Sequence, residues 1–232
     1  MRHAAVIGVS LGDWFPAHAI TSPPAHPLIR LPVFRAWPLC AAHCLFAALL
    51  ITAATGALAA RPSFDCGQPK LAKVEKLVCG DDKLAALDAR MALTYAGAAA
   101  QAVRWKLPLP DQDQQAWLRT RGACVARPDA RACLAELYAR RIAELQASYL
   151  LVHGRAPVEL TCGGEAVSLY FFDTEPATLV VHRAGVATTL FQEKTAGGSR
   201  YAGGDRVYSE HQGEMRLAWG AGAPALRCKS KP

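Results

Sequence analysis

Apolar residues along the chain follow two different periods. From Leu71 to Leu151 they recur every three to four positions, which is typical of helices that pack on one face. After the segment His153–Pro157 they alternate with polar residues, which is typical of β-strands. The change of period predicts a helical domain at residues 60–152, followed by a β domain at residues 157–232.

Four helices are expected in the first domain. Asp81 or Asp82 can cap the second of them, whose inward face carries apolar residues at helical spacing. The two prolines within Leu107–Asp113 end this helix. The expected starts are Pro69, Asp81 or Asp82, Asp111 and Asp129, and the first and third helices are expected to end at Val78 and near Gly122.

Eight short runs rich in β-branched and aromatic residues are expected to form strands in the second domain. Gly, Pro, Asp or Lys separate them, so the turns are tight. This pattern indicates a small antiparallel barrel or a sandwich. The runs cover residues 158–162, 166–172, 177–183, 186–192, 199–202, 206–210, 215–219 and 225–228.

The apolar run Cys44–Ala60 precedes the helical domain. Arg30 and Arg35 come before the run, and Ala57-Leu58-Ala59 is a cleavage site of small residues. Residues 1–59 therefore have the features of a leader with a secretory signal peptide. The alternative is an uncleaved transmembrane anchor, for which seventeen apolar residues are short.

We expect cleavage before Ala60 and a mature protein in the periplasm or outside the cell. Neither Cys40 nor Cys44 follows the small residues that a lipoprotein signal requires. The sequence therefore predicts no stable membrane anchor after cleavage.

Composition and charge exclude several classes of protein. Charged residues make up 19% of the chain and aromatic residues 8%, which argues against a long disordered or coiled-coil protein. The formal net charge of +7 falls to +5 when Arg2, Arg30, Arg35 and Asp13 leave with the leader. The remaining cations are interspersed with acids, so we expect no nucleic-acid partner.

Six cysteines remain after the leader, and an even number in an exported chain predicts three disulfides. Closeness in sequence favours the pairs Cys66–Cys79, Cys124–Cys133 and Cys162–Cys228 among the possible connectivities. No C-x-x-C pair occurs, which argues against a zinc site. We therefore expect neither a metal nor a cofactor.

Residues 60–232, the part of the chain after the expected leader, lack the common motifs of catalysis and nucleotide binding, G-x-S-x-G, H-E-x-x-H and the glycine-rich phosphate loops among them. Paired cysteines leave no thiolate nucleophile, and a cryptic hydrolase would lack its acid and base. We expect a protein that is not an enzyme. Trp117, Arg121 and Tyr138 are interpreted as packing residues of the helices.

Two polar loops of the β domain are candidate binding elements. In residues 193–205 two glycine pairs flank Ser199, Arg200 and Tyr201, which predicts either a protruding turn or a plain hairpin loop. The second loop is Tyr208–Glu214. Loops on a rigid β scaffold suit a binding module better than a catalyst. The candidate residues are Gly197, Gly198, Ser199, Arg200, Tyr201, Tyr208, His211, Gln212 and Gly213.

The stretch Gly197–Tyr201, followed by Tyr208 and Gly213, resembles the membrane-bound inhibitor of c-type lysozyme family, which has a loop S-G-x-x-Y and then aromatic-x-x-K-G-x-x-A. The resemblance covers residues 157–232. It implies a cysteine-closed, eight-stranded antiparallel β-barrel whose two loops enter the cleft of c-type lysozyme and engage its catalytic carboxylates.

The chain departs from this family at its two polar positions. Gly197 stands at the position of the family's serine, and His211 or Gln212 stands near that of its lysine. A protonated His211 can replace the lysine cation, which predicts stronger inhibition at acidic pH.

The helical half is similar to the N-terminal domain of the LprI lysozyme-inhibitor family, over residues 63–146. The stretches that carry the similarity are Ser63–Cys66, Val74–Cys79, Leu84–Tyr95, Trp117–Cys124 and Cys133–Leu145. Together the two resemblances imply an exported inhibitor of c-type lysozyme that plugs the active-site cleft with its barrel loops. The rival hypothesis is a non-inhibitory periplasmic binding or adaptor module for cell-wall fragments or envelope proteins.

Overall fold

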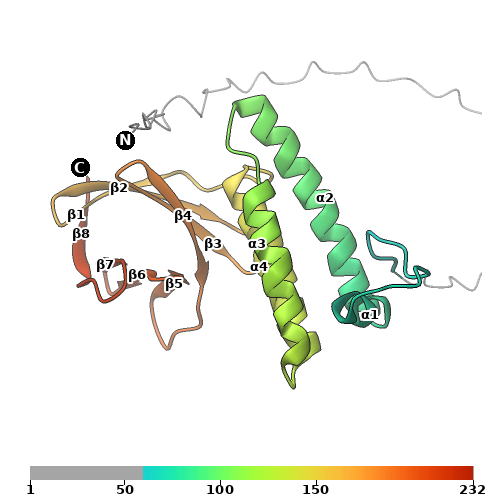
Figure 1. Ribbon diagram of the computed structural model, residues 1–232. Helices are drawn as coiled ribbons and strands as arrows, with labels where there is room; N and C mark the ends of the chain where they lie inside the picture. The colour runs from blue at the N-terminus through green and yellow to red at the C-terminus, as the bar shows by residue number, and fades with distance from the viewer. Residues whose placement is uncertain (1–59, 232) are drawn as a thin grey trace, which may run out of the picture. The chain divides into compact units, whose positions relative to one another are not determined.

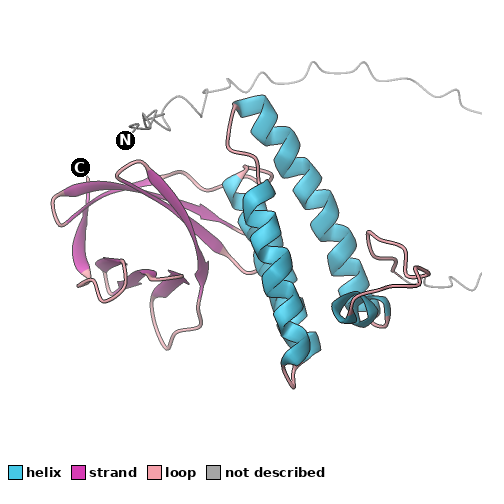
Figure 2. Ribbon diagram, viewed as in Figure 1, coloured by secondary structure: helices cyan, strands magenta, loops and turns pink. Residues whose placement is uncertain are grey.

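The computed structural model describes residues 60–231, so the expected leader at residues 1–59 lies outside the described part of the chain. Within it four α-helices precede eight β-strands (Figure 1 and Figure 2). The helices are α1 (Lys73–Cys79), α2 (Asp82–Trp105), α3 (Asp111–Ala123) and α4 (Ala130–Ser148), with a short 3-10 helix at Cys124–Ala126. The expected order of a helical part followed by a β part, which is an α+β fold, is confirmed. Among residues 60–231 no helix combines the length and the apolar character that crossing a membrane would require.

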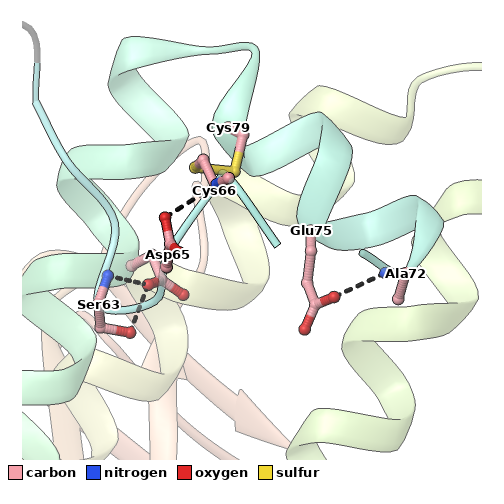
Figure 3. The surroundings of a disulfide bond; sticks show 8 residues. Ser63, Asp65, Cys66, Ala72, Glu75 and Cys79 are labelled. Atoms are coloured by element: carbon pink, nitrogen blue, oxygen red, sulfur yellow. Dashed lines mark hydrogen bonds between the residues drawn. A yellow bond between two sulfur atoms is a disulfide. The ribbon is translucent and has the colours of Figure 1, made fainter. Parts of the chain in front are cut away.

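Local side-chain contacts determine where the first two helices begin. The Asp81 carboxylate accepts the backbone N–H groups of Lys83 (3.0 Å) and Leu84 (3.1 Å), so the predicted cap of α2 is confirmed. The expected start of α1 at Pro69 is wrong. The Glu75 carboxylate accepts the Ala72 N–H at 2.6 Å (Figure 3), and this contact fixes the cap of α1 at Ala72.

All three expected disulfides are confirmed. Cys66–Cys79 joins the segment before α1 to the end of that helix (Figure 3), and Cys124–Cys133 joins the 3-10 helix to α4. Cys162–Cys228 joins the first and the last strand of the β part. Each bridge limits the freedom of the unfolded chain, which matters in parts this small.

A buried carboxylate organises the helical core. Asp88 is 4% exposed and accepts the Tyr138 hydroxyl at 2.7 Å, as well as the backbone N–H (2.7 Å) and hydroxyl (2.6 Å) of Ser63. The Arg121 guanidinium lies 3.4 Å from this carboxylate and donates to the Tyr138 hydroxyl at 2.8 Å. The Trp117 ring packs edge-on against Tyr138, with 5.2 Å between centroids. These contacts support the interpretation of Trp117, Arg121 and Tyr138 as packing residues.

The eight strands form one closed antiparallel barrel in sequence order. Each strand begins and ends within two residues of the expected run, and the barrel rather than the sandwich is the observed arrangement. The strands are β1 (Val158–Cys162), β2 (Glu165–Phe172), β3 (Thr178–Arg183), β4 (Val186–Gln192), β5 (Ser199–Gly203), β6 (Arg206–His211), β7 (Glu214–Trp219) and β8 (Leu226–Ser230).

Alternate residues of each strand fill the interior of the barrel. Its aliphatic centre is almost inaccessible to solvent, with exposures of 1% or less, and it consists of Leu160, Val167, Leu169, Leu179, Val181, Leu190 and Leu217. Burying branched side chains of this kind contributes roughly 1.5–3 kcal/mol each to folding. The period-2 pattern of the sequence therefore corresponds to the inside and the outside of the barrel.

Part of the outer surface of the barrel is buried as well. Val180 alternates with the inward Leu179 and Val181, yet it is only 6% exposed, and Phe191 on β4 is 9% exposed. Helix α4 contacts β3 and β4. The Arg140 guanidinium lies 4.1 Å from the Phe191 ring centroid, and the hydroxyls of Ser148 and Thr189 are 3.0 Å apart. The helix thus covers apolar side chains that strand alternation directs away from the barrel interior.

The Cys162–Cys228 bridge closes a longer loop than the other two, with a sequence separation of 66 residues against 13 for Cys66–Cys79. The double substitution Cys162→Ala/Cys228→Ala should lower the free energy of unfolding by about 4 kcal/mol, and Cys66→Ala/Cys79→Ala by about 3 kcal/mol. Urea unfolding followed by circular dichroism measures both losses. A smaller loss for the barrel bridge would contradict this ranking.

His182 at the end of β3 should make the protein sensitive to acid. Burial lowers the pKa of His182, and the nearby Glu159 only partly offsets this effect. Its contribution to stability is therefore complete above the unfolded pKa of about 6.5 and is lost as pH falls through the folded value. Between pH 7 and pH 5 we expect the melting temperature of the wild type to fall more than that of His182→Gln. Equal falls in the two proteins would refute the assignment.

Candidate functional site

Two connections of the barrel lie side by side at one end. Consecutive strands run in opposite directions, so the connections that follow β4 and β6 emerge at the same end. The strands β5 and β6 pair with Ser199 opposite Glu210 and Tyr201 opposite Tyr208. The β4–β5 loop (residues 193–198) and the β6–β7 turn (residues 211–214) are therefore neighbours, and the candidate residues of both come together.

The glycine pair of the β4–β5 loop allows a close approach of two backbones. Gly198 has φ +72°, and a Cβ atom there would lie 2.1 Å from the backbone oxygen of Glu210. A Cβ on Gly197 would lie 3.3 Å from Cε1 of His211. These glycines seat the loop directly against the end of β6.

The β6–β7 turn is a tight hairpin. Gln212 and Gly213 occupy its two central positions with φ values of +51° and +80°, the pattern of a type I′ turn. The Glu210 carboxylate accepts the Gly213 N–H at 2.9 Å and holds the turn in place. His211 and Gln212 are exposed in this turn.

Residues 199–201 form the start of β5, in agreement with the strand predicted at residues 199–202, so of the two alternatives the plain hairpin loop is observed and the protruding turn is not. The side chains of Tyr201 and Tyr208 are 8% and 4% exposed, and their rings pack against Phe171 with centroids 5.6 and 6.3 Å away. In-register pairing directs both rings into the barrel. Burial raises the pKa of Tyr208 to about 12. Two of the nine candidate residues thus support the loops from inside, and Ser199 and Arg200 are half-buried.

Two ion pairs engage charged side chains at this end of the barrel. Arg200 pairs with Glu193 at 2.6 Å, and Arg155 pairs with Asp173. Lys194 and His211 are exposed and form no ion pair with any residue in the range 60–231. The sequence reasoning overlooked Lys194, although it follows Glu193 directly in a loop already singled out.

This arrangement is suited to binding a carboxylate. The two adjacent connections and the strand ends that flank them carry a lysine, a histidine, a serine and a glutamine, and a charged donor bonds a carboxylate more strongly than a neutral one. Arg200 is less available, since its guanidinium is held by Glu193. The principal free cation of the loops is therefore Lys194 rather than Arg200.

The close approach at Gly198 can be tested against a matched glycine. Gly204 in the β5–β6 turn has a similar φ of +60°, but nothing lies within 4 Å of a Cβ there. Gly204→Ala should cost about 1–2 kcal/mol for the left-handed backbone alone, while Gly198→Ala should cost about 1–3 kcal/mol more because of the clash. Chemical denaturation measures both variants. Equal losses would show that the backbones at Gly198 and Glu210 are not in contact.

Comparison with known proteins relates both halves of the chain to named proteins. Residues 161–226, which include both connections, match the family described as "Membrane-bound lysozyme-inhibitor of c-type lysozyme". The chain is also 31% identical to "Lipoprotein LprI" of Mycobacterium bovis (strain ATCC BAA-935 / AF2122/97) and of Mycobacterium tuberculosis. Each similarity extends over 161 residues, 67% of this chain and 78% of the relative. No solved structure matches the chain significantly.

These names bear on two sequence-based expectations. Both resemblances, one for each half of the chain, are confirmed. The expectation that no membrane anchor remains after cleavage finds no support, because the relatives are named lipoproteins and the matching family is described as membrane-bound. At this identity, and with more than two thirds of the relative covered, the chain belongs to the LprI lipoprotein family.

Proposed function

We propose that the chain is an exported inhibitor of c-type lysozyme that blocks the enzyme's cleft with the β4–β5 loop and the β6–β7 turn. One observation carries the proposal. The segment that matches the lysozyme-inhibitor family contains both connections, and strand pairing sets them side by side at one end of the barrel.

The proposed contact is between exposed nitrogen donors of the barrel loops and the catalytic carboxylates of lysozyme. Lys194 and His211 are exposed and have no ionic partner among residues 60–231, so neither must break an internal pair in order to bind. Ser199 and Gln212 add neutral hydrogen bonds. Because the type I′ turn and the Gly198 contact fix the two connections, little ordering entropy opposes binding.

We further propose the division of the chain into a leader at residues 1–59, a helical domain at residues 60–152 and a barrel domain at residues 157–232. In this arrangement the signal peptide sends the chain to the periplasm or beyond. The name of the LprI relatives supports an attachment to the membrane, which would hold the barrel at the cell envelope where lysozyme acts.

A second function is favoured by one observation. Gly197 stands where the family's loop carries serine, and the β6–β7 turn has no lysine. A barrel that has lost these two side chains could bind a cell-wall fragment or an envelope protein without inhibiting lysozyme.

A lysis assay with a c-type lysozyme tests the proposal. The purified protein should inhibit lysis at micromolar concentrations, and Lys194→Ala and His211→Ala should each raise the inhibitory concentration about tenfold, the effect of losing a charge-assisted hydrogen bond. Ser199→Ala should have a smaller effect because the serine hydroxyl is a neutral donor.

The matched control is Lys73→Ala, which removes an exposed cation from α1 and should leave inhibition unchanged. No inhibition at tens of micromolar by protein with native circular dichroism would reject the inhibitor function and favour the binding module. Inhibition that survives all three loop substitutions would instead reject the loop assignment.

A further inference from the structure

The connection between α2 and α3 lies at one end of the helical part (Figure 1). It carries several exposed apolar side chains. Val103 is 73% exposed, Trp105 40% and Leu109 52%. These are three of the seven large apolar residues that are exposed among residues 60–231, and they fall within seven consecutive positions. Arg104 and Lys106 alternate with them and are exposed too. We call residues 103–109 the basic tip.

The cations of the basic tip have no acidic partner within the described residues. Neither Arg104 nor Lys106 forms an ion pair there, and the Arg104 guanidinium lies 5.2 Å from the centroid of the neighbouring Trp105 ring. The closest acids in sequence, Asp111 and Asp113, belong to the first turn of α3, and Asp111 accepts the Tyr95 hydroxyl. The tip therefore presents positive charge and apolar surface together.

The shape of the basic tip is fixed by hydrogen bonds to the rest of the fold. Leu107 N–H donates to the Ala102 carbonyl at 2.9 Å, and the Tyr149 hydroxyl donates to the Pro108 carbonyl at 3.0 Å. Pro110 behind the tip is buried. Trp105 is thus exposed although hydrogen bonds hold the segment that follows it in place.

Lys106 adopts a backbone conformation that usually belongs to glycine. It ends α2 with φ +56° and ψ +38°, the left-handed region, which costs a residue with a side chain about 1–2 kcal/mol. The chain accepts this strain at an exposed position where the lysine ammonium contacts no acid. Strain kept at such a position points to a role for the side chain itself.

We propose that the basic tip docks on an anionic phospholipid surface. Trp105, Val103 and Leu109 would enter the interface between headgroups and acyl chains, where aromatic and aliphatic side chains are favoured. Arg104 and Lys106 would remain at the level of the lipid phosphates. A second copy of the chain is a poorer occupant, because two such tips would bring unpaired cations together. The surface lies outside the barrel and does not depend on lysozyme binding.

Co-sedimentation with vesicles tests this docking. The exported, processed protein should bind vesicles of phosphatidylglycerol and phosphatidylethanolamine more tightly than vesicles of phosphatidylcholine, and added salt should weaken the binding. Arg104→Glu/Lys106→Glu should weaken binding to the anionic vesicles at least about tenfold, since each cation near such a surface contributes about fivefold. Trp105→Ala should also weaken it. All variants share the same N-terminal part, so any anchor there contributes equally.

Two further variants separate docking from general charge and from folding. Lys73→Glu/Lys76→Glu on α1 makes the same change of net charge at exposed positions and should bind like the wild type. Lys106→Gly should raise the melting temperature by relieving the left-handed lysine, and yet weaken vesicle binding. Equal binding by the tip and α1 double variants, or a tip-dependent dimer without vesicle binding, would overturn the proposal.

Discussion

The antiparallel pairing of β1 with β8 closes the barrel and thereby determines which of its connections are neighbours. Leu160 pairs with Ser230 and Cys162 with Cys228, and the disulfide reinforces the second pair. A closed barrel has no free edge, so its strand order and register cannot shift locally. The position of the β4–β5 loop beside the β6–β7 turn follows from this closure together with the Gly198 contact. The candidate site is in this sense a property of the whole barrel.

A different kind of constraint governs the helices. Hydrogen bonds to one buried carboxylate hold them together, whereas packed leucines fill the barrel. Asp88 draws together the segment before α1, helix α2 and the Tyr138 hydroxyl of α4. Burial raises the pKa of Tyr138 and keeps its hydroxyl a neutral donor. Removing one partner from such a group is expensive because it leaves a buried charge unpaired. The polar cluster therefore determines the arrangement of the helices and also contributes to the stability of their packing.

Sequence periodicity predicts the order of the helices and strands because both halves obey simple rules, whereas the barrel rather than the sandwich is implied by the family resemblance. The strands were predicted within two residues, and the disulfides followed from cysteines that are near in sequence or at the ends of the β part. Contacts between distant residues were not predictable in this way. Asp88 lies among the apolar positions of α2, and nothing local shows that Ser63 and Tyr138 will satisfy it.

The candidate site was likewise predictable from the sequence only in part. The residues of both loops were identified from glycines and polar side chains, and the structure brings them together. The sequence does not distinguish side chains that face solvent from those that face the interior in β5 and β6, so the candidate binding residues include Tyr201 and Tyr208, whose rings are buried. Nor could it show that Glu193 engages Arg200 and leaves Lys194 as the free cation.

Helix α4 has consequences for any attempt to work with the barrel by itself. One side of this helix belongs to the core around Tyr138, and the other lies on β3 and β4 through Arg140 and Ser148. Cutting the chain between α4 and β1, in the segment His153–Pro157, would expose Phe191 and Val180 on the outer surface of an otherwise complete barrel. Such a fragment would expose a hydrophobic patch that α4 covers in the full chain, and this patch would favour aggregation. Fragments for binding or crystallisation experiments should therefore retain α4, or replace the uncovered side chains with polar ones.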